Sequence, residues 1–575
     1  MKNIWCLALV FFLVSCGNSG LKERDKYRDL IKAGKVKEAI QFVEENEFFN
    51  DENNALLKNL ELGMGHHLSG NYYQSTKYLD KAKEIHQKLF TVSLSKKAGT
   101  LVTNENFDIY YGYTYERSLI HFYLSLNHFL SYQKGYYEAY TVKDKDGNKK
   151  EVPKKELSVT EKQRELQGAR AELLGWDTYL KDQANQKKGR SVFKVDLLAK
   201  TYGGFIHEAI GTSQDLQIAL RLYKDAKLFL FRNYNAYSTF NKSNKMFRKD
   251  YKKLPKMKEE DVKKKYVKQT QFQEELKDFL DFKILKLTKK VDGRNYKKMV
   301  KRHKPTKKVL DRLKNEKSDS NVGVVYMHGF IPSKVPSKQY YGFGAVLNDP
   351  KASGAAKAAA AIGAVAISLF AAQTLGLMPP PRRYTPIGAE FGYQTARLTG
   401  EHAAIAFELP RIKPRPVKKT SNVVFTKGDG SNGIALDVPV INPMGDIAHE
   451  AIVEDSSSKY KKLGSRLVLK HLTAIMASYA TYKALKNSGK AGFLAKQAAV
   501  LQYLAASKGI EASEKADVRY WSTLPSTIRF ADIALPEGDY QATLKEFDGK
   551  NLTKSLPMGG IQASAGKKII SKRSL

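Results

Sequence analysis

Residues 69–82 read SGNYYQSTKYLDKA and predict a tightly packed helix that begins after a turn. Ser75, Leu79 and Ala82 follow one another at intervals of four and three residues, which places a small, an apolar and another small side chain on one helical face. Gly70 stands just before this helix, where glycine commonly ends the preceding helix and turns the chain. The stretch therefore predicts two helices that approach each other closely across a short turn.

The same pattern occurs twice more, once near the N-terminus and once, with a short insertion, around residues 209–226. Gly34 and Gly70 lie about one repeat length apart, and the spacing resembles the second helix of tetratricopeptide repeats (TPR), whose unit is a helix-turn-helix of about 34 residues. The residues that we expect to pack these repeats are Gly34, Ala39, Gly70, Tyr72, Leu79, Ala82, Gly211, Ala219, Tyr223 and Ala226.

Two further helices are expected in the same half of the chain. Residues 117–131 are strongly apolar, and residues 160–186 form a long polar pattern whose apolar contacts would be Leu166, Leu173, Leu174 and Trp176. Repeat helices of this kind stack to bury their apolar faces, and the stack presents a concave surface that commonly binds a peptide or protein. We therefore expect a TPR-like helical repeat domain over residues 16–241.

Residues 242–320 are dense in lysine and are expected to form a helical linker. Phe272, Leu276, Phe279 and Leu280 keep a helical apolar stripe within it. The rest is typical of solvated helix, and a functional basic arm is the less favoured alternative, because charge runs are usually solvated.

From residue 321 the pattern changes towards strands, so we expect a smaller α+β C-terminal domain over residues 321–575 and a mainly α fold for the whole chain. A helix is expected over residues 445–507. The strand-like ranges are 322–331, 402–409, 422–426, 527–535 and 540–547.

Residues 358–378 carry no charge and meet the length of about 20 residues that spans a bilayer. Their alanine and glycine content makes the hydropathy modest. A buried or surface-associated helix is therefore favoured over a membrane-touching insertion.

The N-terminus predicts export and lipidation. A basic start is followed by the apolar run IWCLALVFFLV at residues 4–14 and then by Ser15 and Cys16, which is typical of a secretory signal and too short to span a bilayer. The order Leu-Val-Ser-Cys resembles the lipobox of bacterial lipoproteins, which implies a signal peptide over residues 1–15 and a lipid such as palmitate on Cys16. A plain signal peptide with an incidental cysteine is the alternative. Gly17, where an aspartate would favour the inner membrane, favours the outer membrane.

The composition constrains the partners. Lysine and arginine number 97 against 59 acidic residues, a net charge of +38, and such a field attracts polyanions. An exported chain is not expected to meet nucleic acid, so an anionic lipid or an acidic envelope polymer is the better candidate for a partner. A solvated basic surface without a specific partner is slightly favoured over either. Cys6 would leave with the signal peptide, so the mature chain depends on its core rather than on disulfides.

No catalytic, metal or cofactor site is predicted. His207-Glu208 and His449-Glu450 begin like a zinc-protease helix but lack the second histidine four residues on. His328-Gly329 follows a strand, yet the chain contains no Gly-x-Ser-x-Gly sequence to supply a nucleophile.

Two aromatic features are expected to be structural. Trp521 and Pro525 are interpreted as a core anchor at the entry to a strand. Of the adjacent pair His66 and His67, one is expected to face the core and the other to face outward, so shared metal ligation is not expected.

Several segments together resemble an uncharacterised family of bacterial TPR-repeat-containing lipoproteins. They are LELGMGHHL at residues 60–68, LFTVSLS at 89–95, and ADVRYWSTLP at 516–525 with the strand-like residues that follow it. In that family these segments mark the two ends of the mature protein, so the resemblance covers most of the chain except the lysine-rich range and residues 358–378. It implies an envelope role and no catalytic residues.

The expected function is a non-enzymatic scaffold, attached by lipid to the outer membrane and facing the periplasm, that binds a protein partner of the envelope through its repeats. The alternative is an envelope hydrolase or peptidoglycan-acting enzyme with its site in the C-terminal half. A deep C-terminal cleft with convergent His, Asp or Glu would favour the enzyme, and a groove over the repeats would favour the scaffold.

Overall fold

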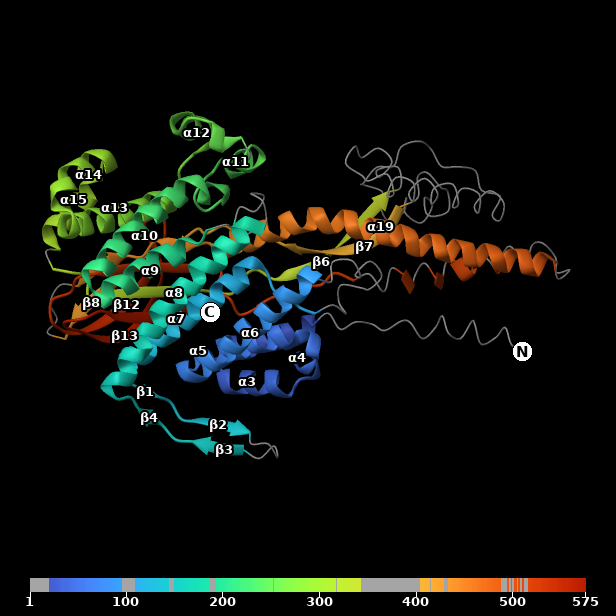
Figure 1. Cartoon of the computed structure of the whole chain (residues 1–575), viewed down its shortest axis with the longest axis horizontal. Coiled ribbons are helices and arrows are strands. Elements are labelled where there is room, and N and C mark those ends of the chain that lie inside the picture. Colours follow the sequence, from blue (N-terminus) through green and yellow to red (C-terminus); the bar gives the residue numbers. More distant parts are fainter. Residues whose placement is uncertain are drawn as a thin grey trace.

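The fold is mainly helical, with a strand-containing region in the later part of the chain, as the sequence predicts (Figure 1). The computed structural model describes residues 20–95, 109–143, 149–186, 193, 195–251, 253–316, 318–342, 404–413, 415–428, 433–487 and 515–575, and parts of 494–510. Cys16 and residues 358–378 lie outside these ranges. None of the described helices combines the length and apolar character that crossing a bilayer requires.

Paired helices build the N-terminal part. Helices α5 and α6, α7 and α8, and α9 and α10 pack against each other as consecutive pairs. The helices are α2 (Leu21–Lys32), α3 (Val36–Glu45), α4 (Glu47–Asn50), α5 (Ala55–Leu68), α6 (Tyr72–Ser95), α7 (Thr114–Lys134), α8 (Val159–Gln186), α9 (Leu197–Ile210) and α10 (Ser213–Arg232). The short strands β1 (Tyr136–Tyr137), β2 (Tyr140–Lys143), β3 (Lys149–Val152) and β4 (Lys155–Glu156) separate α7 from α8.

Glycines shape these pairs in two ways. Gly34, Gly70 and Gly211 adopt φ of 74°, 80° and 77°, the left-handed conformation that glycine adopts without strain and that turns the chain between two helices. Gly63 in α5 lies against α6, because a Cβ there would stand 2.7 Å from the side chain of Leu79. The close packing of α5 on α6 therefore depends on a residue without a side chain.

The expected packing face of the repeats lies in the core. Six of its side chains have no exposed surface: Ala39, Leu79, Ala82, Ala219, Tyr223 and Ala226. Tyr72 is partly buried. In α8, Leu166, Leu173 and Trp176 are buried, whereas Leu174 is 62% exposed, so the expectation that Leu174 is an apolar contact is wrong.

The lysine-rich range contains α11 (Asn244–Lys249), α12 (Glu259–Tyr266), α13 (Gln271–Val291), α14 (Tyr296–His303) and α15 (Lys307–Asn315). Helix α13 packs against α10, and its stripe of Phe272, Leu276, Phe279 and Leu280 is buried. Lys283 on the same helix is also buried, with an ion pair to Asp532 at 2.5 Å. This range thus supplies a packed helix as well as surface lysines.

Two four-stranded sheets, in the orders β10-β11-β5-β14 and β13-β12-β8-β9, and a two-stranded β6-β7 sheet form the later part. In the first, β5 pairs antiparallel with β11 and parallel with β14. The strands are β5 (Val322–His328), β6 (Lys334–Gly342), β7 (Ala404–Ile412), β8 (Thr420–Lys427), β9 (Ile434–Asp437), β10 (Val440–Asn442), β11 (Thr527–Ile533), β12 (Gly538–Asp548), β13 (Asn551–Ala563) and β14 (Lys568–Ser574). Helix α19 (Met444–Asn487) follows β10 and extends well beyond the rest of the molecule (Figure 1).

Helices and the first sheet share one core. Phe530 of β11 is fully buried and its ring lies 5.5 Å from that of Phe205 in α9 and 6.2 Å from that of Phe279 in α13. One hydrophobic cluster runs from Tyr27 in α2 to Ile570 in β14. The apolar faces of the helical pairs are therefore covered largely by the chain's own later strands.

Candidate functional site

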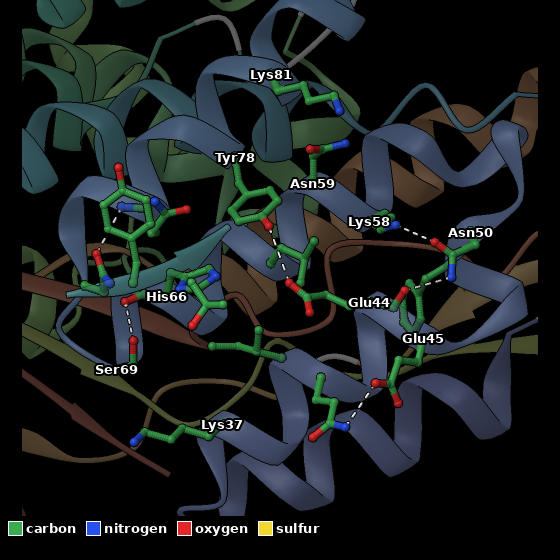
Figure 2. Close-up of a pocket in the computed structure, with 18 of the residues that line it drawn as sticks. Lys37, Glu44, Glu45, Asn50, Lys58, Asn59, His66, Ser69, Tyr78 and Lys81 are labelled. Carbon is green, nitrogen blue, oxygen red and sulfur yellow. Dashed lines mark hydrogen bonds between the residues drawn. The ribbon is translucent and has the colours of Figure 1, made fainter. Parts of the chain in front are cut away.

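A groove in the first helices is the candidate site. It has a volume of about 980 Å³ (Figure 2). Its lining comes from α3, α5 and α6, from the segment between α3 and α5, and from residues 138–141, the last two of which belong to β2. The turn at Gly70 brings α5 and α6 together, and α3 packs against α5, so the groove is built from three consecutive parts of the N-terminal helices.

The floor of the groove is apolar and aromatic. His66, at the end of α5, stacks on Tyr78 of α6 with ring centroids 5.2 Å apart and an interplanar angle of 7°. Burial lowers the pKa of His66 to about 4 and raises the pKa of Tyr78 to about 12. Both rings are therefore uncharged near neutral pH, and they lie next to Ile40 and Leu62.

The rim of the groove is charged and polar. The Tyr78 hydroxyl points at Glu44 and lies 3.5 Å from its Oε1, and Gln41 donates to Glu45 at 3.0 Å (Figure 2). Lys58 donates a short hydrogen bond to Asn50. The charged lining residues are Lys37, Glu44, Glu45, Asp51, Glu52, Lys58, Lys81 and Glu138.

Of the residues expected to pack the repeats, none lines the groove directly. Leu79 and Ala82 face the core, while their neighbours Tyr78 and Lys81 face the groove. Ala39 likewise faces the core, next to the lining residue Ile40. Gly211, Ala219, Tyr223 and Ala226 belong to the α9–α10 pair, which does not contribute to it.

Two of the segments that carry the family resemblance, residues 60–68 and 516–525, contact each other. Glu61 of α5, which is 1% exposed, accepts hydrogen bonds from the Ser522 backbone N–H at 2.7 Å and the Ser522 hydroxyl at 2.8 Å, and also from the Thr523 hydroxyl. Burial raises the pKa of Glu61 to about 7, and the donated hydrogen bonds oppose that rise. Residues 60–68 and 516–525 therefore form one buried polar joint.

A second carboxylate reinforces this joint. Glu116 of α7 is fully buried and accepts a hydrogen bond from the backbone N–H of Trp521 at 2.9 Å. Arg28 of α2 donates a hydrogen bond to the Tyr520 hydroxyl at 2.9 Å. Burial raises the pKa of Glu116 above its ordinary value. Trp521 has no exposed surface, which confirms it as a core residue.

The histidine pair divides as the sequence predicts. His67 is 6% exposed and its Nδ1 lies 2.7 Å from Oδ1 of the buried Asn127, whereas His66 lines the groove. The two rings thus lie on different surfaces of α5.

The zinc-like sequences have structural partners. His207 lies 2.7 Å from Asp215, and Glu208 accepts from the Tyr223 hydroxyl at 2.7 Å and pairs with Lys283 at 2.8 Å. His449 contacts Glu450 at 3.0 Å. Within the described ranges, no group of three or more His, Cys, Asp or Glu side chains is placed to hold a metal ion.

A polar cluster at the end of β5 resembles a hydrolytic site in composition but not in geometry. The Tyr326 hydroxyl lies 2.7 Å from both the Ser574 hydroxyl and Glu546 Oε1. His328 Nδ1 lies 3.1 Å from Ser574 and 3.4 Å from Glu546. A catalytic triad uses one ring nitrogen for the serine and the other for the acid, and here a single nitrogen faces both groups.

Comparison with known proteins adds no relative. No family model matches the chain, and neither a curated protein nor a solved structure proved similar to it.

Proposed function

We propose that this protein is a lipid-anchored, non-enzymatic scaffold of the bacterial envelope that binds a protein partner in the groove formed by α3, α5 and α6. The observation that carries the proposal is the groove itself, a hollow of about 980 Å³ with an aromatic floor and a polar rim. Aromatic anchors surrounded by polar groups are the usual composition of the energetically dominant part of a protein interface.

The arrangement of the helices supports the same proposal. Consecutive helical pairs with left-handed glycine turns are the architecture that TPR-like repeats would produce. Much of their apolar surface is covered by the chain's own sheet, in which Phe530 contacts both α9 and α13. The groove lies on surface that this sheet leaves open, so a partner could reach it without displacing the core.

The proposed anchor would hold this groove close to a membrane. Leu21, where α2 begins, is five residues after Cys16, and five residues span at most about 18 Å. A lipid on Cys16 would therefore place the first helices at the bilayer surface, where a partner in the same membrane meets them at high local concentration.

Site-specific photo-crosslinking tests the proposal in intact envelopes. A benzoylphenylalanine at the position of Lys81, on the rim, should form one discrete adduct, and the same probe at the position of the exposed Met246 should not. The Cys16→Ala variant should incorporate no labelled palmitate and should lose the adduct. Equal adducts from both probe positions, or none from the rim, would refute partner binding in the groove, and palmitate in Cys16→Ala would refute the anchor.

A further inference from the structure

We infer that the segment bound in the groove is cationic, a stretch of a partner protein in which lysine or arginine alternates with apolar side chains. This inference rests on the proposed scaffold function and specifies the chemistry of its partner. It runs against the composition of the chain as a whole, whose charge of +38 would favour anionic partners.

The charge of the groove differs in sign from that of the chain. Its lining holds five carboxylates and three lysines, which gives a formal charge of −2. At physiological ionic strength, charges more than about 8 Å away are largely screened. A bound segment therefore responds to the acidic lining rather than to the basic surface elsewhere.

The carboxylates of the lining are available to a cation. Within the described part of the chain, Glu44, Glu45 and Glu52 form no ion pair with a lysine or arginine; Glu44 faces the Tyr78 hydroxyl and Glu45 faces the Gln41 amide. Glu138 differs, because it pairs with Lys134. Glu44 is half-buried, whereas Glu45 and Glu52 are exposed, and each carboxylate can gain a charge-assisted hydrogen bond when a cation arrives.

The floor favours the same ligand chemistry. Tyr78 and His66 present stacked, uncharged rings, and the face of an aromatic ring attracts a lysine or arginine cation. The partly buried Ile40 supplies apolar surface in the same lining. An anionic segment would meet five carboxylates against three lysines in this lining, so electrostatics disfavour it.

Three labelled peptides of about 12 residues test the inference, with leucine at alternate positions and lysine, glutamine or glutamate between. Fluorescence anisotropy with the full-length lipidated protein in detergent should show the tightest binding for the lysine peptide, weaker binding for the glutamine peptide and the weakest for the glutamate peptide. Binding of the lysine peptide should weaken between about 50 and about 500 mM salt.

Charge-reversal variants give the sharper comparison. Glu44→Lys with Glu45→Lys should weaken the lysine peptide about tenfold, because two attractions become repulsions. The matched control is Glu260→Lys with Asp311→Lys, which makes the same change in net charge at exposed positions on α12 and α15 and should have little effect. Lys37→Glu with Lys81→Glu should tighten binding, which a merely misfolded protein cannot do.

The outcomes separate this inference from the scaffold proposal. Tightest binding of the glutamate peptide, no binding of any peptide, or equal effects of the groove and control reversals would overturn the cationic assignment. If the rim crosslink still forms in any of these cases, the groove binds a partner of different chemistry and the scaffold proposal stands. If the rim crosslink is absent, the scaffold proposal itself fails.

Discussion

Replacing Glu61 by glutamine should change how the stability of the protein depends on pH. The carboxyl group is buried between α5 and residues 522–523, and burial raises its pKa from 4.5 to about 7. That difference corresponds to about 3 kcal/mol. Glutamine has nearly the same shape, can still accept from the Ser522 N–H, and never ionises, so the substitution removes the titration while keeping most of the packing.

The sign of the effect follows from proton binding. Between pH 4.5 and about 7 the folded protein holds a proton on Glu61 that the unfolded chain releases, so the stability contributed by the protonated group falls as pH rises through this range. Relative to the wild type, Glu61→Gln should therefore gain about 2 to 3 kcal/mol in unfolding free energy between about pH 5 and about pH 8.

Urea unfolding followed by tryptophan fluorescence measures this difference, because the buried Trp521 is the neighbour of Ser522. Glu260→Gln, at an exposed position on α12, is the control and should follow the wild-type profile. Parallel pH profiles for wild type and Glu61→Gln would refute the reasoning, because they would mean that the buried carboxyl group does not titrate differently in the two states.

Two substitutions test the packing of the helices. Lys283→Met should lower the unfolding free energy by about 3 kcal/mol, because it removes the nearer cation from the buried carboxylates of Glu208 and Asp532 and leaves them only Lys567, at 3.5 and 4.0 Å. Lys290→Met, at a half-exposed surface pair, should cost less than about 1 kcal/mol. Equal melting temperatures for the two variants would contradict this. Gly70→Ala should lower the unfolding free energy by about 1 kcal/mol, because a φ of 80° strains any residue with a Cβ. Gly293→Ala is the control and should be nearly neutral. A neutral Gly70→Ala in calorimetry would show that the turn relaxes.

Much of the helical architecture follows from local spacing. Small and apolar residues at intervals of three and four, such as Ser75, Leu79 and Ala82, are enough to predict which helical face is buried. The adjacent face of α6, which carries Tyr78 and Lys81, lines the groove. Periodicity identifies that face as exposed, but the hollow also depends on the angle between α3, α5 and α6, which the spacing of residues within one helix does not fix.

The features that the sequence does not predict depend on contacts between distant residues. Lys283 lies in a lysine-rich range that is typical of solvated helix, and its burial depends on Glu208 and Asp532, which are remote in the sequence. Glu61 and Ser522 each stand in a conspicuous motif, yet nothing in either motif indicates that they touch. The sequence pattern does not predict strands β13 and β14, because proline, glycine and charge interrupt their apolar alternation.

The position of β14 has a consequence for biosynthesis. The central strand β5 pairs on one side with residues 527–533 and on the other with residues 568–574, so helices made early by the ribosome lack their partner sheet until more than half of the polypeptide has followed. Such long-range pairing makes folding slow and late. In the exported protein that we propose, this delay would keep the precursor in a translocation-competent state.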